Sequence, residues 1–115
     1  MKFGTMYNQG DIVIVPFPFS DLSAIKQRPV LILSRDKDIQ DSEDVITCGM
    51  TSNLKNAKYS IMVENKDLEI GSIPVKSRIK LDKIFTLDKK TIIKKVAKIN
   101  KQTLEKVKKE FVNLI

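Results

Sequence analysis

Short runs of β-branched and aromatic residues follow one another along most of this chain, and only its last segment has a helical repeat. Runs of four to eight such residues, bounded by polar or proline-containing segments, are typical of β-strands. The pattern predicts strands within residues 11–19, 29–34, 45–52, 59–64 and 72–81. Five or six short strands in 115 residues favour a small, strongly bent barrel.

The first two strands are predicted to form a hairpin with a long connection. We expect the first strand to end near Pro16, because proline cannot donate to a ladder. Residues 20–27 are polar and irregular, and the second apolar run begins at Pro29. Long connections in small barrels often carry function. This places Arg28, at the end of the connection, among the candidate functional residues.

Two later strands have a clear alternation. In residues 45–52 one face carries Ile46, Cys48 and Met50, and the other carries Thr47, Gly49 and Thr51. In residues 72–81 an apolar face interrupted by Ser77 alternates with Pro74, Lys76, Arg78 and Lys80. Side chains of a strand point alternately to its two faces. We therefore expect Cys48 to be a buried small hydrophobe and residues 72–81 to have one basic face.

The chain ends in a predicted amphipathic helix. Asn100 can cap it, and one apolar stripe follows with Leu104, Val107, Phe111 and Leu114. Such a helix packs on a barrel or at a subunit interface. Residues 92–99 fit either a last strand or a short helix. The prediction for residues 1–115 is thus a single α+β, mainly β, domain whose open edges dimerisation would cover.

The composition removes most common catalytic sites. The chain has no histidine, one cysteine and four glycines, which excludes imidazole catalysis, thiolate zinc cages and glycine-rich phosphate loops. The acidic residues 36–47 fail as a calcium loop, because Asp41 stands where glycine is required and Thr47 where glutamate is required. We expect residues 35–44 to be a solvated loop, and no metal or cofactor.

Charge and hydropathy suggest the kind of binding partner and the cellular location. Residues 76–115 carry 13 basic and 4 acidic side chains, whereas residues 1–75 carry 8 and 10. A positive region of this size favours RNA, DNA or an acidic protein, although a solvated lysine surface has the same composition. We find no run of about 18 apolar residues, no secretory signal and no second cysteine. We therefore expect a cytoplasmic protein with no membrane contact.

Arg28 and Thr51 are the candidate catalytic residues. Pro29 restricts Arg28 to extended geometry, and its planar fork matches phosphate oxygens. RNA carries its own nucleophile, the 2′-hydroxyl, so a protein that orients it and stabilises phosphate charge is sufficient. A free arginine has a pKa above about 12 and is a poor general base, which assigns Arg28 to charge stabilisation and leaves proton transfer open. The structural alternatives are a surface arginine and a β-forming threonine.

Three segments in matching order resemble the PemK/MazF toxin family. Residues 10–34 look like its opening, with the Arg28-Pro29 pair, and residues 50–52 and 82–89 look like its second and third motifs. The resemblance implies an SH3-like (PemK/CcdB-type) barrel with a C-terminal helix, and a homodimeric toxin neutralised by an acidic antitoxin. It implies a metal-independent endoribonuclease that cuts single-stranded mRNA, leaves 2′,3′-cyclic phosphate and 5′-hydroxyl ends, and arrests growth.

The same resemblance assigns residues to roles. The family's catalytic arginine and threonine fall on Arg28 and Thr51, and an RNA-holding serine falls on Ser77, where a barrel-lining serine bonded to backbone is the alternative. The remaining candidate RNA-binding residues are Ser52, Asn53, Lys76, Arg78 and Lys80. Two other functions stay open: a same-fold toxin acting on a protein such as gyrase, and a non-catalytic SH3-like RNA- or protein-binding module.

Overall fold

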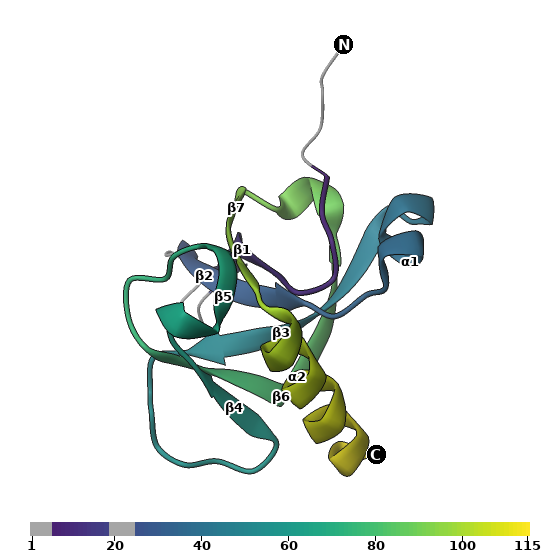
Figure 1. Ribbon diagram of the computed structural model, residues 1–115. Coiled ribbons are helices and arrows are strands. Elements are labelled where there is room, and N and C mark those ends of the chain that lie inside the picture. The colour runs from purple at the N-terminus through teal and green to yellow at the C-terminus, as the bar shows by residue number, and fades with distance from the viewer. Residues whose placement is uncertain (1–5, 19–24) are drawn as a thin grey trace.

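A curled antiparallel sheet makes up most of the computed structural model, which describes residues 6–18 and 25–115 (Figure 1). Its strands are β1 (Asp11–Pro18), β2 (Ile25–Ile32), β3 (Asp44–Thr51), β4 (Ser60–Val63), β5 (Leu68–Gly71), β6 (Ser77–Asp88) and β7 (Lys94–Ile99). The helices are α1 (Asp36–Asp41) and α2 (Lys101–Leu114), with two 3-10 turns, Asn65–Asp67 and Lys89–Thr91. The strand order is β4-β6-β3-β2-β1-β7-β5. The predicted mainly β barrel with a C-terminal helix is confirmed.

The sheet buries apolar side chains on both faces. The helix-side core, which α2 covers, contains Ile12, Leu31, Cys48, Met50, Ile79, Leu81 and Val107. The second core, on the opposite face, contains Val13, Val15, Val30, Ile32, Val45 and Ile92. Each fully buried Val, Leu or Ile side chain contributes roughly 1.5–3 kcal/mol, so two small cores can stabilise a chain of this length.

The C-terminal helix forms as the sequence predicts. Asn100 Oδ1 accepts a hydrogen bond from the Thr103 backbone N–H at 2.9 Å, which caps the first turn. Leu104, Val107 and Phe111 pack on the helix-side core, and α2 contacts β4 and β6. Within residues 6–18 and 25–115, neither α2 nor α1 has the length and apolar character that a membrane crossing requires.

The first hairpin is confirmed, but its strands are longer than predicted. β1 passes through Pro16 and ends at Pro18, and β2 already begins at Ile25. The Ile14 carbonyl points toward β7 and accepts a hydrogen bond from the Ile93 N–H. The backbone nitrogen of Pro16, two residues further along β1, points toward the same edge. β7 pairs only with residues 11–14 of β1. The missing proline N–H therefore costs no ladder bond, and residues 19–24 of the connection lie outside the described residues.

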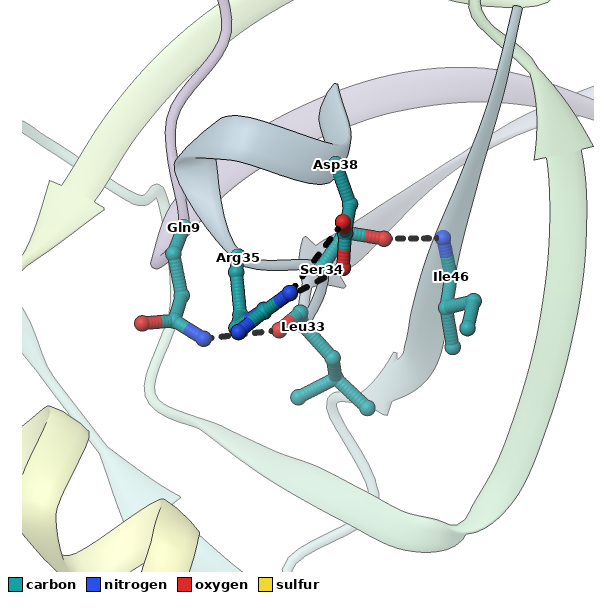
Figure 2. A network of polar contacts seen from close by, with 6 residues as sticks. All are labelled: Gln9, Leu33, Ser34, Arg35, Asp38 and Ile46. Atoms are coloured by element: carbon teal, nitrogen blue, oxygen red, sulfur yellow. Dashed lines mark hydrogen bonds and ion pairs between the residues drawn. The ribbon is translucent and has the colours of Figure 1, made fainter. Parts of the chain in front are cut away.

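Two further expectations need correction. Residues 35–44 contain α1 rather than only loop, because Asp36 and Asp38 lie in its first turn and Ile39 anchors it by burial. Figure 2 shows the polar contacts around it: Gln9 donates to the Leu33 carbonyl, Ser34 Oγ accepts from Ile46, and Arg35 pairs with Asp38. The strand within residues 72–81 begins only at Ser77. Of the two alternatives left open for residues 92–99, the structure shows the strand, at residues 94–99.

Thr47 also differs from its expected place. The sequence puts Thr47 on a polar face of its strand, but the side chain is fully buried. That face carries the second core, and the Thr47 hydroxyl is satisfied there by donating to the Phe85 carbonyl at 3.0 Å. The alternation itself is correct, since Cys48 and Met50 share the helix-side core.

Candidate functional site

Arg28, Thr51 and Arg78 form a row at the same end of three neighbouring strands. The β2–β3 ladder ends where Val30 pairs with Gly49, and Arg28 and Thr51 lie two residues further along their strands, on the wall of one cavity. Thr51 pairs in turn with Arg78 of β6. Side chains two residues apart share a face. The row therefore extends the face of the second core into a polar end of the sheet, and Arg28 lies within β2 rather than in a loop.

A cavity of about 690 Å³ opens over this row. The neighbouring row of the same face contains Val30, Gly49 and Lys80. Gly49 has no side chain, so the sheet is hollow between Val30 and Lys80. The walls include Arg28, Thr51 and Arg78, together with Asn53, Lys55 and Ala57 from the loop that follows β3.

The cavity is strongly cationic. Its lining contains five basic side chains and one carboxylate: Arg28, Lys55, Arg78, Lys80, Lys83 and Asp82. The Lys80 ammonium and the Asp82 carboxylate are 3.8 Å apart. Apolar walls with an excess of one charge concentrate a field of that sign. The site is thus suited to an anion, and above all to a phosphodiester chain.

The Thr51 hydroxyl oxygen accepts a hydrogen bond from the backbone. The donor is the Asn53 backbone N–H, at 3.1 Å, and Asn53 Oδ1 accepts that of Lys55 at 3.1 Å. A hydroxyl has one donor hydrogen and two acceptor sites. With an acceptor site used by the backbone, the Thr51 O–H can donate to a ligand oxygen.

The structure separates the sequence-predicted residues into three groups. Arg28, Thr51, Asn53, Arg78 and Lys80 line the 690 Å³ cavity. Ser52 and Ser77 line a second cavity of about 570 Å³, which shares Arg28 with the first. Lys76 lines neither of these cavities, and its ammonium lies 3.8 Å from the Glu64 carboxylate.

Ser77 makes the contact that its structural alternative predicts. The side chain is buried, and Ser77 Oγ donates to the Val75 carbonyl at 3.1 Å. Ser77 also lines the second cavity, together with Arg28 and Ser52, and its hydroxyl oxygen can still accept a hydrogen bond. A structural role for Ser77 is therefore visible, and an RNA contact stays a prediction.

Sequence reasoning missed several lining residues. Phe17 and Phe85 meet edge to face, with ring centres 5.3 Å apart, and both line the first cavity. Phe17 could have been found, because it shares strand parity with Val15. Asp82 and Lys83 could not, because they lie in a bulge where three residues of β6 have no partner on β3.

Cys48 has no catalytic environment. The side chain is fully buried, and burial raises the pKa of its thiol to about 12. A thiol with such a pKa stays protonated at neutral pH, so it supplies neither a nucleophile nor a metal ligand. Among the residues that the structure describes, no three cysteine or acidic side chains come together as a metal site requires.

The fold and the site together define a class: a small SH3-like barrel whose sheet carries a cationic cavity lined by an arginine and a threonine. A family model for the PemK-like, MazF-like toxin of type II toxin–antitoxin systems matches residues 8–115. The chain therefore belongs to this toxin family. A comparison with curated proteins found no match.

Solved structures of similar fold agree with this assignment. The chain is 18% identical to an endoribonuclease from mycobacterial species, with a TM-score of 0.74 over 97% of this chain and 93% of the other. It is 18% identical to MazE–MazF from Deinococcus radiodurans, with a TM-score of 0.77 over 96% of both chains. It is 17% identical to the Mycobacterium tuberculosis toxin MazF-mt6, with a TM-score of 0.70 over 90% and 93%. At such identities the likeness concerns the fold.

Proposed function

We propose that this toxin is an endoribonuclease that cleaves single-stranded mRNA and thereby arrests growth. The observation that carries the proposal is that Arg28 and Thr51 line the same cationic cavity. Two structures of similar fold are named as mycobacterial endoribonucleases, one of them in complex with its cognate antitoxin, which supports the same activity for this chain.

The cleavage uses the 2′-hydroxyl of the RNA. This oxygen loses its proton and attacks the adjacent phosphorus, the bond to the 5′-oxygen breaks, and the leaving 5′-oxygen takes up a proton, so that no proton is gained or lost overall. The products are a 2′,3′-cyclic phosphate and a 5′-hydroxyl end, and no metal or cofactor is needed. Arg28 binds the phosphate oxygens through its fork, and the Thr51 O–H donates to one of them as charge develops.

RNA follows the basic end of the sheet on both sides of Arg28. Lys80 and Asn53 contact it in the first cavity, and Ser52 and Ser77 contact it in the second. Arg78 shapes the first cavity, and Lys76 contributes to the field at the start of β6. Phosphate neutralisation by such side chains releases counterions, so RNA binding weakens as salt rises.

A second copy and an acidic antitoxin are the proposed protein partners. Exposed Ile46, Ile84 and Val112 border a groove of about 920 Å³ between α2, β3 and β6. An apolar groove of this kind suits a homodimer interface. The MazE–MazF structures of similar fold support an antitoxin, and the basic C-terminal region supports its acidic character. We place the protein in the cytoplasm, where its substrate is.

The test uses purified protein and long single-stranded RNA in EDTA, with Arg28→Ala beside the wild type. We expect discrete cuts with 5′-hydroxyl ends from the wild type and none from the variant, with both proteins folded. Intact RNA from a folded wild-type protein would contradict the proposal. A search for a protein target such as gyrase, or for RNA binding without cleavage, would then follow.

A further inference from the structure

We propose that Arg78 is a positioning residue: it holds the loop of residues 52–59 as a wall of the first cavity and thereby determines which RNA sequences the site accepts. This inference rests on the proposed ribonuclease function for its effect on RNA. The contacts by which Arg78 fixes the loop lie entirely within the chain and do not depend on RNA. It gives Arg78 a different role from the phosphate contact that its charge alone suggests.

The sheet topology forces this loop across β6. In the strand order β6 lies between β3 and β4, although β4 directly follows β3 in the chain. Residues 52–59 must therefore pass from one neighbour of β6 to the other. Arg78 pairs with Thr51, the last residue of β3, and with Met62 of β4. Its side chain stands on the cavity face at the point where the loop crosses.

The Arg78 guanidinium binds both ends of the crossing loop. Its Nε donates to the Leu54 carbonyl at 3.3 Å, and its Nη1 donates to Ser60 Oγ at 3.0 Å. Ser60 Oγ donates in turn to the Ala57 carbonyl at 2.6 Å. A planar fork with several N–H groups can hold two acceptors at fixed directions, which a single ammonium cannot do.

Little else holds the loop in place. Residues 52–56 are all exposed, and the loop's largest aliphatic side chain, Leu54, is 41% exposed. Its other contacts are the short-range bonds at Thr51 and Asn53 and the Tyr59 carbonyl, which accepts from Leu81. At its end, Tyr59 packs on the helix-side core, but none of residues 52–58 is buried. A segment without buried apolar anchors opens easily, so the bonds from Arg78 determine where residues 54–57 lie.

The loop supplies the variable wall of the site. Asn53, Lys55 and Ala57 line the cavity from this loop, whereas Arg28 and Thr51 lie on strands. Proteins read single-stranded RNA through base edges and faces that touch such walls. A shifted loop therefore changes which base fits, while the strand residues keep their place.

The test compares Arg78→Lys, which keeps the charge, with Ser60→Ala, which removes one acceptor and no charge. Lys80→Gln is the matched control, since it removes a charge from the same face and touches no loop bond. We expect hydrogen exchange of the amides in residues 53–59 to be about tenfold faster in the first two variants without RNA, as for a lost hydrogen bond. We expect both to cut additional sequences, with KM raised more than kcat is lowered.

The proposal would be overturned if Arg78→Lys had the hydrogen-exchange rates and the cleavage sites of the wild type. It would be overturned above all if Arg78→Ala, unlike Arg78→Lys, weakened RNA binding and lowered the salt dependence of that binding. Such a result would make Arg78 a phosphate contact. If the wild-type protein cut no RNA, the proposed function would fail separately. The exchange measurement would still decide whether Arg78 holds the loop, with unchanged exchange counting against it.

Discussion

At the scale of single side chains, Arg28 and Thr51 have different proposed roles. Arginine offers a planar set of N–H donors, and the Thr51 hydroxyl has an acceptor site occupied by the Asn53 backbone N–H at 3.1 Å. Thr51 lines the cavity, so its hydroxyl hydrogen remains available for donation to a ligand oxygen there. Both groups are donors, which suits a transition state that gathers negative charge on phosphate oxygens.

Thr51→Val removes this donor with almost no change of shape. We expect cleavage to fall about 10²-fold, the usual effect of losing one donor to a developing charge, while Thr51→Ser keeps most of the activity. Single-turnover cleavage rates measure the difference, and thermal melting of each variant controls for folding. Equal rates for Thr51→Val and the wild type would remove Thr51 from the mechanism.

Cys48 predicts a pH dependence of stability. Burial raises the pKa of its thiol to about 12, above the unfolded value of about 8.5. The unfolded chain therefore loses this proton first, so the contribution is complete below about pH 8.5 and is lost as pH rises toward 12. Compared with Cys48→Ala, the wild type should lose up to about 1.4 kcal/mol of unfolding free energy per pH unit in this window. Parallel curves from denaturant unfolding would contradict this.

At the scale of elements, the site depends on the register of β2, β3 and β6. Val30, Gly49 and Lys80 are cross-strand neighbours, and the absent side chain of Gly49 leaves space next to the Arg28–Thr51–Arg78 row. A Cβ built on Gly49 would lie 3.5 Å from the Lys83 Cβ, an ordinary contact. The position therefore tolerates a small side chain.

The variants Gly49→Ala and Gly49→Leu distinguish the effect of filling the first cavity from the effect of destabilising the fold. We expect the alanine variant to fold and cut RNA, because its added carbon fits. The leucine side chain would project into the cavity, and we expect cleavage to fall at least tenfold through a raised KM. Kinetics with a short RNA, beside melting temperatures, test this. A leucine variant with wild-type KM would show that substrate does not enter this cavity.

Local sequence patterns predicted the individual strands and the C-terminal helix better than they predicted how the strands pair in the sheet. Period-two alternation placed Cys48 and Ile79 in the core, and Asn100 marked the start of α2. The pairing of β3 with β6 joins residues that are 27 to 44 positions apart, from Thr51 with Arg78 to Asp44 with Asp88, and nothing local encodes it. The bulge at residues 81–83 contains no glycine or proline that would announce it. For the same reason the sequence identified Arg28 and Thr51 as candidates but could not show that Ser52 and Ser77 line a different cavity.

At the scale of the whole molecule, the first cavity and the apolar groove lie on different parts of the surface and have Ile84 in common. The groove lies between α2, β3 and β6, with a polar rim that includes Ser34, Arg35 and Asp38 (Figure 2). The first cavity lies at the other end of β3, around Thr51. We therefore expect substitutions away from Ile84 to change the proposed assembly and the proposed RNA cleavage independently.

Val112→Glu should weaken the proposed homodimer. Val112 is 65% exposed and borders the groove, so a buried carboxylate in the dimer would be costly. Ile70→Glu is the matched control, because Ile70 is 62% exposed on β5, away from the groove. Sedimentation equilibrium should show a dimer for the wild type and Ile70→Glu, and a monomer for Val112→Glu. A dimer in all three would place the interface elsewhere.

The central claim is that the Arg28–Thr51 cavity cleaves RNA through the substrate's own 2′-hydroxyl. The most direct test is a single-stranded RNA with one mapped cleavage site, compared with the same RNA carrying a 2′-deoxy nucleotide only on the 5′ side of that bond. We predict 2′,3′-cyclic phosphate and 5′-hydroxyl products from the first in EDTA, and an intact bond in the second, which still binds. Cleavage of the deoxy substrate at the same bond would contradict the account.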